Sequence, residues 1–239
     1  MEDARRKLGF IVNPLAGIGG RVGLKGSDGA DTVKKAFELG AEMVSPDRAL
    51  ETLNMLSSEK DRFELVTYPD EMGEKEAATS GFHPVVLGSI QSGQTTAEDT
   101  RRAAIEMKEY GVDLIIFVGG DGTARDIYEA VGTSIPVMGI PAGVKIHSSV
   151  YAVNPRRAAD LIKAFLDGKA PTQEMEVMDI DEELFREGRV SARLYGYLKV
   201  PYERRLIQGA KSPTRGSGQN LRGIAAAVVE RMDDDDVYY

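Results

Sequence analysis

The stretch DLIIFVGGDGTARDIYEA (113–130) decides the fold. Its apolar residues Leu114 to Val118 follow one another without a polar interruption, which predicts a strand buried on both faces of a parallel sheet. The glycine-rich run 119–123 comes next, and a helical pattern begins at Ala124. A buried strand, a tight turn and a helix form the repeating unit of a doubly wound α/β domain, in which ligands bind at the carboxyl ends of the strands.

The same alternation runs through the first 170 residues. Short apolar runs bounded by Gly, Pro or Asn predict strands at 8–13, 63–68, 84–90, 113–119 and 136–140. Amphipathic patterns predict helices at 31–41, 46–59, 71–79, 97–110, 124–132 and 155–168. The spacing of Thr95 and Glu98 is that of a capping box at the start of the fourth helix. We therefore expect an α/β fold with a Rossmann-like, doubly wound parallel sheet over 1–170.

The character of the chain changes near Pro171. Segments 174–181 and 188–202 alternate apolar and polar residues, as half-exposed antiparallel strands do. The pattern of residues 219–232 predicts a helix. Residues 171–239 are thus expected to form a second, smaller β-rich domain. Since the last three residues, 237–239, resemble the start of a strand, we expect this domain to be incomplete.

Composition excludes several classes of protein. The 239 residues include no cysteine and only two histidines, His83 and His147, so there is no disulfide framework, thiolate metal site or histidine zinc cluster, and a Cys-His or Ser-His-Asp hydrolase is disfavoured. There is neither a signal-peptide core nor a long apolar run, which favours a cytoplasmic protein without a membrane partner. The net charge of −8 argues against nucleic acid as a partner.

That net charge hides a basic segment. Residues 186–222 hold nine basic and two acidic side chains, a local charge of +7, whereas 233–236 are four consecutive aspartates. The acidic run is most simply solvated. The basic segment is either a solvated face or, as we prefer, a cleft wall that attracts the phosphates of ATP or polyphosphate.

The run Gly119, Gly120, Asp121, Gly122, Thr123 suits phosphate binding. Glycines allow close backbone approach, and the amides at a helix start offer N–H groups to an anion. Asp121 would repel a phosphate unless it held Mg²⁺ or accepted a proton from an attacking hydroxyl, which are both roles found in phosphoryl transfer. The alternative is a tight turn that happens to use Gly and Asp.

Two further loops follow strands. Residues 13–29 contain six glycines with Arg21 and Lys25, but fit neither a Walker A loop nor GxGxxG, so phosphate contact and a flexible linker both stay open. Residues 139–149 contain Gly143, Lys145 and His147, and a lone histidine is more often structural. All three loops are expected to meet on one rim of the sheet.

The combination of NPLAG (13–17), VGGDGTARDI (118–127) and GIPAGVKIHSS (139–149) resembles the NAD kinase and diacylglycerol kinase superfamily, and within it the predicted ATP-NAD kinases of archaea and bacteria. The resemblance covers about 8–181 and implies a Rossmann-like domain followed by a β-sandwich, with substrates between them. It implies that Asp121 is catalytic, activating the acceptor hydroxyl or holding Mg²⁺. It also implies a nucleotide and substrate site made of Asn13, Gly17, Gly119, Gly120, Gly122, Thr123, Asp126, Gly143 and Lys145. For Asp126, an ordinary acid in the first turns of a helix is an equal alternative.

The chain departs from the family pattern at the third loop. Val144 and Ile146 replace a threonine and an asparagine, and the Asn-Glu dipeptide that NAD kinases use on the substrate ribose does not occur. The resemblance implies a kinase that transfers a phosphoryl group from ATP or polyphosphate, with Mg²⁺, to the 2′-hydroxyl of NAD. A lipid or other hydroxyl acceptor and a non-catalytic nucleotide sensor stay open. Expected partners are small nucleotides and further copies of the chain in a homo-oligomer.

Overall fold

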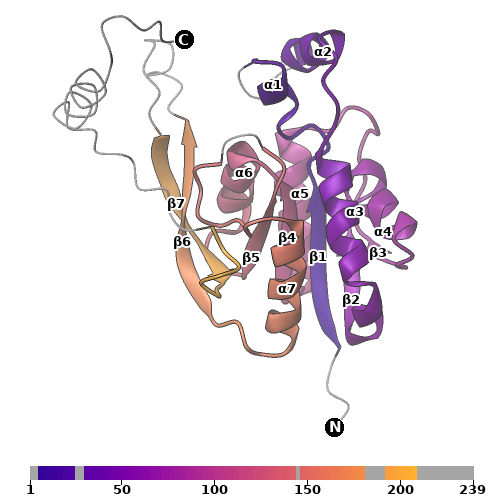
Figure 1. The fold of residues 1–239 in the computed structure, drawn as a ribbon. Coiled ribbons are helices and arrows are strands. Elements are labelled where there is room, and N and C mark those ends of the chain that lie inside the picture. Colours follow the sequence, from indigo (N-terminus) through magenta and orange to yellow (C-terminus); the bar gives the residue numbers. More distant parts are fainter. Residues whose placement is uncertain (1–4, 25–29, 144–145, 181–191, 209–239) are drawn as a thin grey trace, which may run out of the picture.

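The computed structural model of the protein describes residues 5–24, 30–143, 146–180 and 192–208 (Figure 1). Its centre is a parallel sheet of five strands in the order β3-β2-β1-β4-β5. The strands are β1 (Arg6–Val12), β2 (Phe63–Thr67), β3 (Val85–Val86), β4 (Leu114–Gly119) and β5 (Val137–Pro141). The expected parallel sheet of an α/β fold is therefore confirmed, because each of the five predicted strands contributes residues to it.

The chain reverses its direction across the sheet beside β1. It proceeds from β1 to β2 and β3 on one side and then returns to β4 and β5 on the other, with Leu8 paired to both Leu65 and Leu114. Because β1 and β4 are neighbours, the loops that follow them leave the sheet in opposite directions. Such a reversal opens a crevice at the carboxyl edge of an open α/β sheet.

Helices cover both faces of the sheet (Figure 1). On one face lie α3 (Ser45–Met55), α4 (Glu74–Thr79) and α7 (Pro155–Leu166), and on the other lie α5 (Ala97–Tyr110) and α6 (Asp121–Val131). The short helices α1 (Ile18–Arg21) and α2 (Ala30–Glu38) stand beyond the carboxyl edge, and 3₁₀ turns η1 (Ser57–Arg62) and η2 (Asp70–Met72) precede β2 and α4.

The structure corrects several predicted boundaries. The helix predicted over 46–59 ends at Met55 and is followed by η1. The predicted strand 84–90 is reduced to β3, because Gly88 has a φ of +63° that ends the extended run. The predicted helix 71–79 is divided into η2 and α4 by Gly73, with a φ of +130°. The helix predicted from Ala124 begins three residues earlier, at Asp121.

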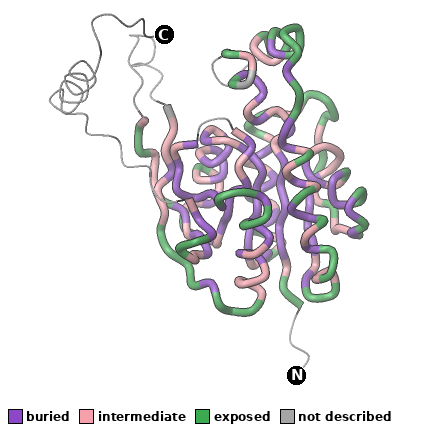
Figure 2. Tube along the Cα trace, in the orientation of Figure 1, coloured by how far each residue is buried: buried purple, intermediate pink, exposed green. Residues whose placement is uncertain are grey.

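A pair of antiparallel strands packs beside this sheet. The strands β6 (Thr172–Ile180) and β7 (Ala192–Pro201) confirm the antiparallel pair expected after Pro171. Their buried residues Val177, Leu198 and Val200 belong to the same apolar core as the parallel sheet. Figure 2 shows how buried segments run through the centre of the molecule. The predicted helix 219–232, the acidic run and the last three residues lie outside the described residues, and the domain boundary near 170 stays a prediction.

The capping box of α5 lies one residue later than predicted. The hydroxyl of Thr96 accepts a hydrogen bond from the Asp99 N–H, and the Asp99 carboxylate accepts one from the Thr96 N–H at 2.8 Å. Thr95 and Glu98 therefore do not form the cap. The sequence offers two threonines in succession, and the one that takes the extended conformation next to the helix acts as the cap.

We expect Thr96→Ala to lower the free energy of unfolding by about 1 kcal/mol, because it removes the acceptor for an N–H group in the first turn of α5. The matched control is Thr95→Ala, whose lost hydroxyl makes no hydrogen bond in the described structure, and which should change stability by less than about 0.5 kcal/mol. Urea unfolding of the wild type and of the two variants measures these changes in the free energy of unfolding. Equal losses in the two variants would contradict the cap assignment.

Glu76 on α4 is a buried carboxyl group. Its side chain is in a residue that is 6% exposed, and its Oε2 has no hydrogen-bond partner within the described part of the chain. Burial raises the pKa of Glu76 from 4.5 to about 7, against the opposing effects of its own backbone hydrogen bond and of Lys75. The folded chain therefore binds this proton more tightly than the unfolded chain does.

A raised carboxyl pKa makes the folded state lose stability as pH rises. For Glu76 the loss begins near pH 4.5 and is complete above about pH 7, and at one pKa unit per 1.36 kcal/mol it amounts to about 3 kcal/mol. We expect Glu76→Gln to remove this dependence. Urea unfolding at pH 5 and pH 8 measures it: the stability difference between variant and wild type should shift by about 2–3 kcal/mol toward the variant at pH 8. An unchanged difference would show that Glu76 ionises freely.

Candidate functional site

Asn13 connects the loop after β1 to the start of α6. Its Nδ2 donates a hydrogen bond to Thr123 Oγ1 at 2.9 Å, and its Oδ1 accepts one from the Leu15 N–H at 3.2 Å. Its own N–H donates to the carbonyl of Val118 at 3.0 Å. Asn13 therefore fixes the first loop against the second, which follows β4.

Gly17 brings the first loop against the third. Its φ is +76°, and a Cβ at this position would lie 2.4 Å from the carbonyl oxygen of Ala142. The N–H of Ala142 in turn donates to the Gly119 carbonyl at 2.9 Å, and a Cβ on Gly143 would lie 3.6 Å from the Gly120 Cα. At Gly17 the two backbones approach so closely that only glycine fits, whereas the approach of Gly143 to Gly120 is an ordinary van der Waals contact. The structure thus brings together the three loops that the sequence predicts on one rim.

Asp121 is the first residue of α6, and its side chain faces the third loop. Its Oδ2 accepts a hydrogen bond from the His147 N–H at 2.7 Å, and its Oδ1 accepts one from the Ser148 N–H at 2.9 Å. The residue is 8% exposed. The carboxylate therefore has a fixed orientation between the second and third loops.

Ser148 extends this connection to the antiparallel strands. Its Oγ donates to the Met178 carbonyl at 2.8 Å and accepts from the Met178 N–H at 2.9 Å. Because Met178 lies in β6, one chain of contacts runs from α6 through the third loop to the β6 and β7 pair. The position of Asp121 thus depends on both parts of the molecule.

The first turn of α6 presents backbone amides that have no acceptor in the described part of the chain. Among the described residues, the N–H groups of Asp121, Gly122 and Thr123 donate to no oxygen atom, and a Cβ on Gly122 would have no heavy atom within 4 Å. Thr123 itself is 3% exposed and its Oγ1 accepts from Asn13, so its hydroxyl belongs to the scaffold. An anion could approach the helix start over Gly122, where the helix dipole favours it.

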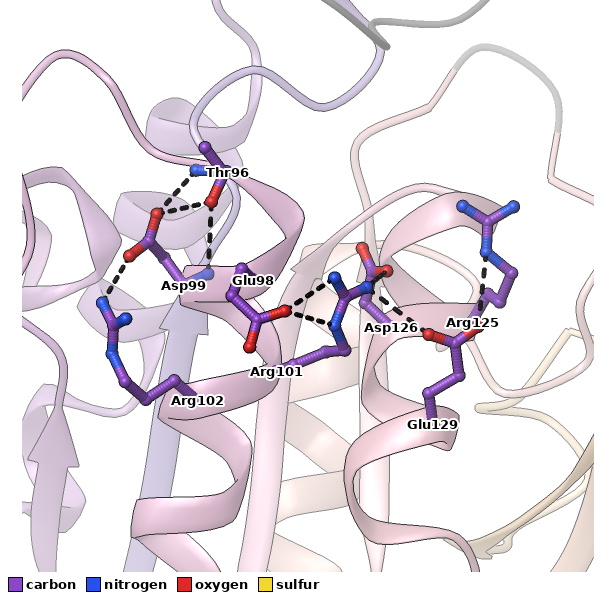
Figure 3. A network of polar contacts seen from close by, with 8 residues as sticks. All are labelled: Thr96, Glu98, Asp99, Arg101, Arg102, Arg125, Asp126 and Glu129. Carbon is purple, nitrogen blue, oxygen red and sulfur yellow. Dashed lines mark hydrogen bonds and ion pairs between the residues drawn. The ribbon is translucent and has the colours of Figure 1, made fainter.

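Asp126 lies on α6 and contacts α5. Its carboxylate contacts the Arg101 guanidinium at 2.8 Å, and the same guanidinium contacts Glu98 and Glu129 (Figure 3). The residue is 5% exposed. The structure therefore gives Asp126 a role in joining α5 to α6, and its predicted contact with a metal or ribose stays a prediction.

Two residues near the loops were missed by the sequence analysis. Arg125 lies one helical turn after Asp121, pairs with Asp179 of β6 at 3.0 Å and lies over the Tyr195 ring. The spacing of four residues from Asp121 was a signal for it. Tyr151 donates a hydrogen bond to the Gly120 carbonyl at 2.6 Å, and no local sequence pattern indicates that contact.

Some predicted residues cannot be placed. Lys145, Val144 and Lys25 lie outside the described residues, as does most of the basic segment 186–222. Ile146, where the family has asparagine, is buried in the apolar core. The imidazole of His147 has a buried Nε2 without a hydrogen-bond partner in the described structure.

The described ranges lack two features that mark other protein classes. They hold no group of three or more His, Asp or Glu side chains arranged to bind a metal ion. They also contain no helix that combines the length and apolarity needed to cross a bilayer.

Comparison with solved structures gives only distant similarity. A protein of Bacillus anthracis described as a candidate diacylglycerol kinase is 18% identical with a TM-score of 0.36, over 75% of this chain and 46% of that one. A diacylglycerol kinase from the same organism is 17% identical with a TM-score of 0.30, over 76% and 44%. The chain thus spans less than half the length of either structure. No curated protein matches the sequence.

The family profile of the ATP-NAD kinase N-terminal domain matches residues 8–170. This range begins in β1 and ends just after α7, so it includes the whole parallel sheet and the three loops at its carboxyl edge. The matched part is more than half of the sequence, and it contains the GGDGT run that opens α6. By its sequence the chain therefore belongs to the ATP-NAD kinase N-terminal domain family.

Proposed function

We propose that the protein transfers a phosphoryl group from ATP or polyphosphate to the 2′-hydroxyl of NAD, giving NADP. The observation that carries this proposal is the environment of Asp121. Its carboxylate is held by two backbone N–H groups of the third loop, directly beside the amides at the start of α6 that donate to no described oxygen. Family membership supports NAD as the acceptor.

The start of α6 would bind the donor phosphates. The amides of Asp121, Gly122 and Thr123 and the dipole of the helix both favour negative charge there. Arg125, one turn further along α6, would add a cation on the side of β6. These groups supply the charge neutralisation on which phosphoryl transfer depends.

Asp121 would act on the acceptor hydroxyl. A carboxylate has about four lone-pair positions, and the His147 and Ser148 amides occupy two of them. The remaining positions can accept the proton of the attacking hydroxyl. They also fit Mg²⁺, which binds through one or two carboxylates together with substrate phosphates and would neutralise phosphate charge.

A second candidate function is nucleotide sensing without turnover. It is favoured by the same two hydrogen bonds, because a carboxylate that already accepts them at 2.7 and 2.9 Å is well suited to hold two loops together. In that case the nucleotide would bind at the start of α6 and no acceptor would be phosphorylated.

The decisive experiment is a phosphate-acceptor screen with the full chain. Mg-ATP and polyphosphate are offered as donors, and NAD, a diacylglycerol and a sphingoid base as acceptors, with calorimetry for ATP and NAD binding. We expect NADP from NAD alone. Binding of ATP and NAD without NADP formation supports the sensor, and turnover of a lipid but not of NAD assigns a lipid acceptor. No binding and no turnover would refute both proposals.

A further inference from the structure

The hydroxyl group of Tyr151 is a buried hydrogen-bond donor at the back of the phosphate-binding turn. Tyr151 is 0% exposed, and its hydroxyl donates to the Gly120 carbonyl at 2.6 Å. Burial, followed by the charges of Asp121, Asp179 and Asp126, raises the pKa of Tyr151 well above 10. The hydroxyl therefore keeps its proton at neutral pH and donates it to this carbonyl.

The aromatic ring of Tyr151 is fixed by β5 and β4. The backbone on either side of Tyr151 pairs with Gly139, whose N–H donates to Val150 and whose carbonyl accepts from Ala152, both at 2.9 Å. A Cβ on Gly139 would lie 2.4 Å from the ring, so glycine makes room for it. On β4, Phe117 packs edge-on, with 5.4 Å between ring centroids. The core of the sheet thus determines where the hydroxyl lies.

The Gly120 carbonyl sets the direction of the next amide. In a trans peptide the carbonyl of one residue and the N–H of the next point in opposite directions. The Gly120 oxygen is held on one side of the peptide by the Tyr151 hydroxyl and by the Ala124 N–H at 3.0 Å. The Asp121 N–H must then point the other way, out of the helix start, as do those of Gly122 and Thr123.

The turn itself has little intrinsic preference for this orientation. Gly120 lies between Gly119 and Asp121, and Gly122 follows, so three glycines in four positions leave the peptide free to rotate in the absence of other contacts. The Ala124 N–H and the hydroxyl of the rigid Tyr151 side chain together remove that freedom. Tyr151 does so from the core and contributes no atom to the edge of the sheet at which the three loops meet.

We propose that Tyr151 is a positioning residue whose hydroxyl orients the Gly120–Asp121 peptide so that the Asp121 amide faces the phosphates of the bound nucleotide. The inference rests on the proposed function, since it takes the start of α6 as the phosphate site. Tyr151 acts through Gly120 and touches no substrate. It links the packing of β4 and β5 to the geometry of the phosphate site.

The test compares Tyr151→Phe with Tyr128→Phe in the full chain. Both variants keep an aromatic ring and lose one hydroxyl; Tyr128 packs over Gly196 of β7, and its hydroxyl has no hydrogen-bond partner in the described structure. ATP affinity is measured by calorimetry and adenosine affinity by ligand-observed NMR. For Tyr151→Phe we expect ATP to bind about tenfold more weakly and adenosine unchanged, because only the phosphate contacts are disturbed. Tyr128→Phe should bind both as the wild type does.

Three results would overturn the inference. Wild-type ATP affinity in Tyr151→Phe would show that the hydroxyl does not matter, and an equal loss for ATP and adenosine would show a general structural effect. Wild-type protein that binds neither ATP nor polyphosphate would refute the proposed function itself, which separates the two failures. If Tyr151→Phe does not fold, the Asp121 amide resonance of the wild type replaces it: ATP must shift that resonance, and an unshifted one refutes the inference.

Discussion

The Asp121→Asn variant is expected to lose at least about 100-fold in phosphoryl transfer to the acceptor identified by the screen. An amide side chain can neither accept the proton of the acceptor hydroxyl nor hold Mg²⁺ as a carboxylate does. It also offers one acceptor oxygen where the His147 and Ser148 amides need two, so its NH₂ group would face an N–H donor. We therefore expect a loss of stability of about 1–3 kcal/mol as well, measured by urea unfolding.

Ser148→Ala separates these two effects. It keeps the backbone amide that donates to Asp121 but removes the hydroxyl that bonds twice to Met178. For Ser148→Ala we expect a loss of stability similar to that of Asp121→Asn, with most of the phosphoryl-transfer activity retained. Full turnover in Asp121→Asn would disprove the role proposed for the carboxylate, whereas equal loss of turnover in both variants would make Asp121 a structural connection only.

The Gly17→Ala variant is expected to lose about 3–4 kcal/mol of stability and to bind ATP more weakly. The left-handed conformation at a φ of +76° costs alanine about 1–2 kcal/mol by itself. In addition, the new Cβ would lie 2.4 Å from the Ala142 carbonyl oxygen, a backbone atom that cannot yield without moving the third loop. Urea unfolding and calorimetry with ATP measure the two effects.

Gly23→Ala is the matched control, since its φ is +74° and no atom of the described residues lies within 4 Å of a Cβ there. It should show the conformational cost alone, about 1–2 kcal/mol, with ATP affinity unchanged. The difference between the two variants therefore reports the contact between the first and third loops. If Gly17→Ala were no more destabilised than Gly23→Ala, the close approach of these loops would be absent in solution.

Sequence patterns were sufficient wherever local chemistry determines structure. The uninterrupted apolar run at Leu114 predicts β4, because such a run is stable only when both faces are covered. The patterns failed where the outcome depends on contacts across the fold. Thr95 and Thr96 have the same side chain, so the sequence does not show which of them caps α5. At Gly88, just after β3, the Tyr68 side chain leaves no room for a Cβ, and this contact is not visible in the local sequence.

The same distinction holds for the candidate site. The glycines and Asp121 could be selected from their position after a buried strand, and the expectation that three loops converge followed from the parallel sheet. The hydrogen bonds from His147 and Ser148 to Asp121, and from Tyr151 to Gly120, join positions that are 26 to 31 residues apart. No local periodicity encodes such pairs, so only the folded chain reveals that Asp121 is restrained from the third loop.

The placement of β1 between β2 and β4 affects how the chain emerges from the ribosome. One edge of β1 pairs with β2 at residues 63–67, but the other waits for β4 at residues 114–118. At about 5–20 residues per second, a nascent chain therefore leaves the second backbone edge of Leu8 to Val12, a segment without polar side chains, unpaired for seconds after β2 is made. Until β4 arrives, that edge is a template for pairing with other chains, and chaperone binding in this interval would favour the native sheet over aggregation.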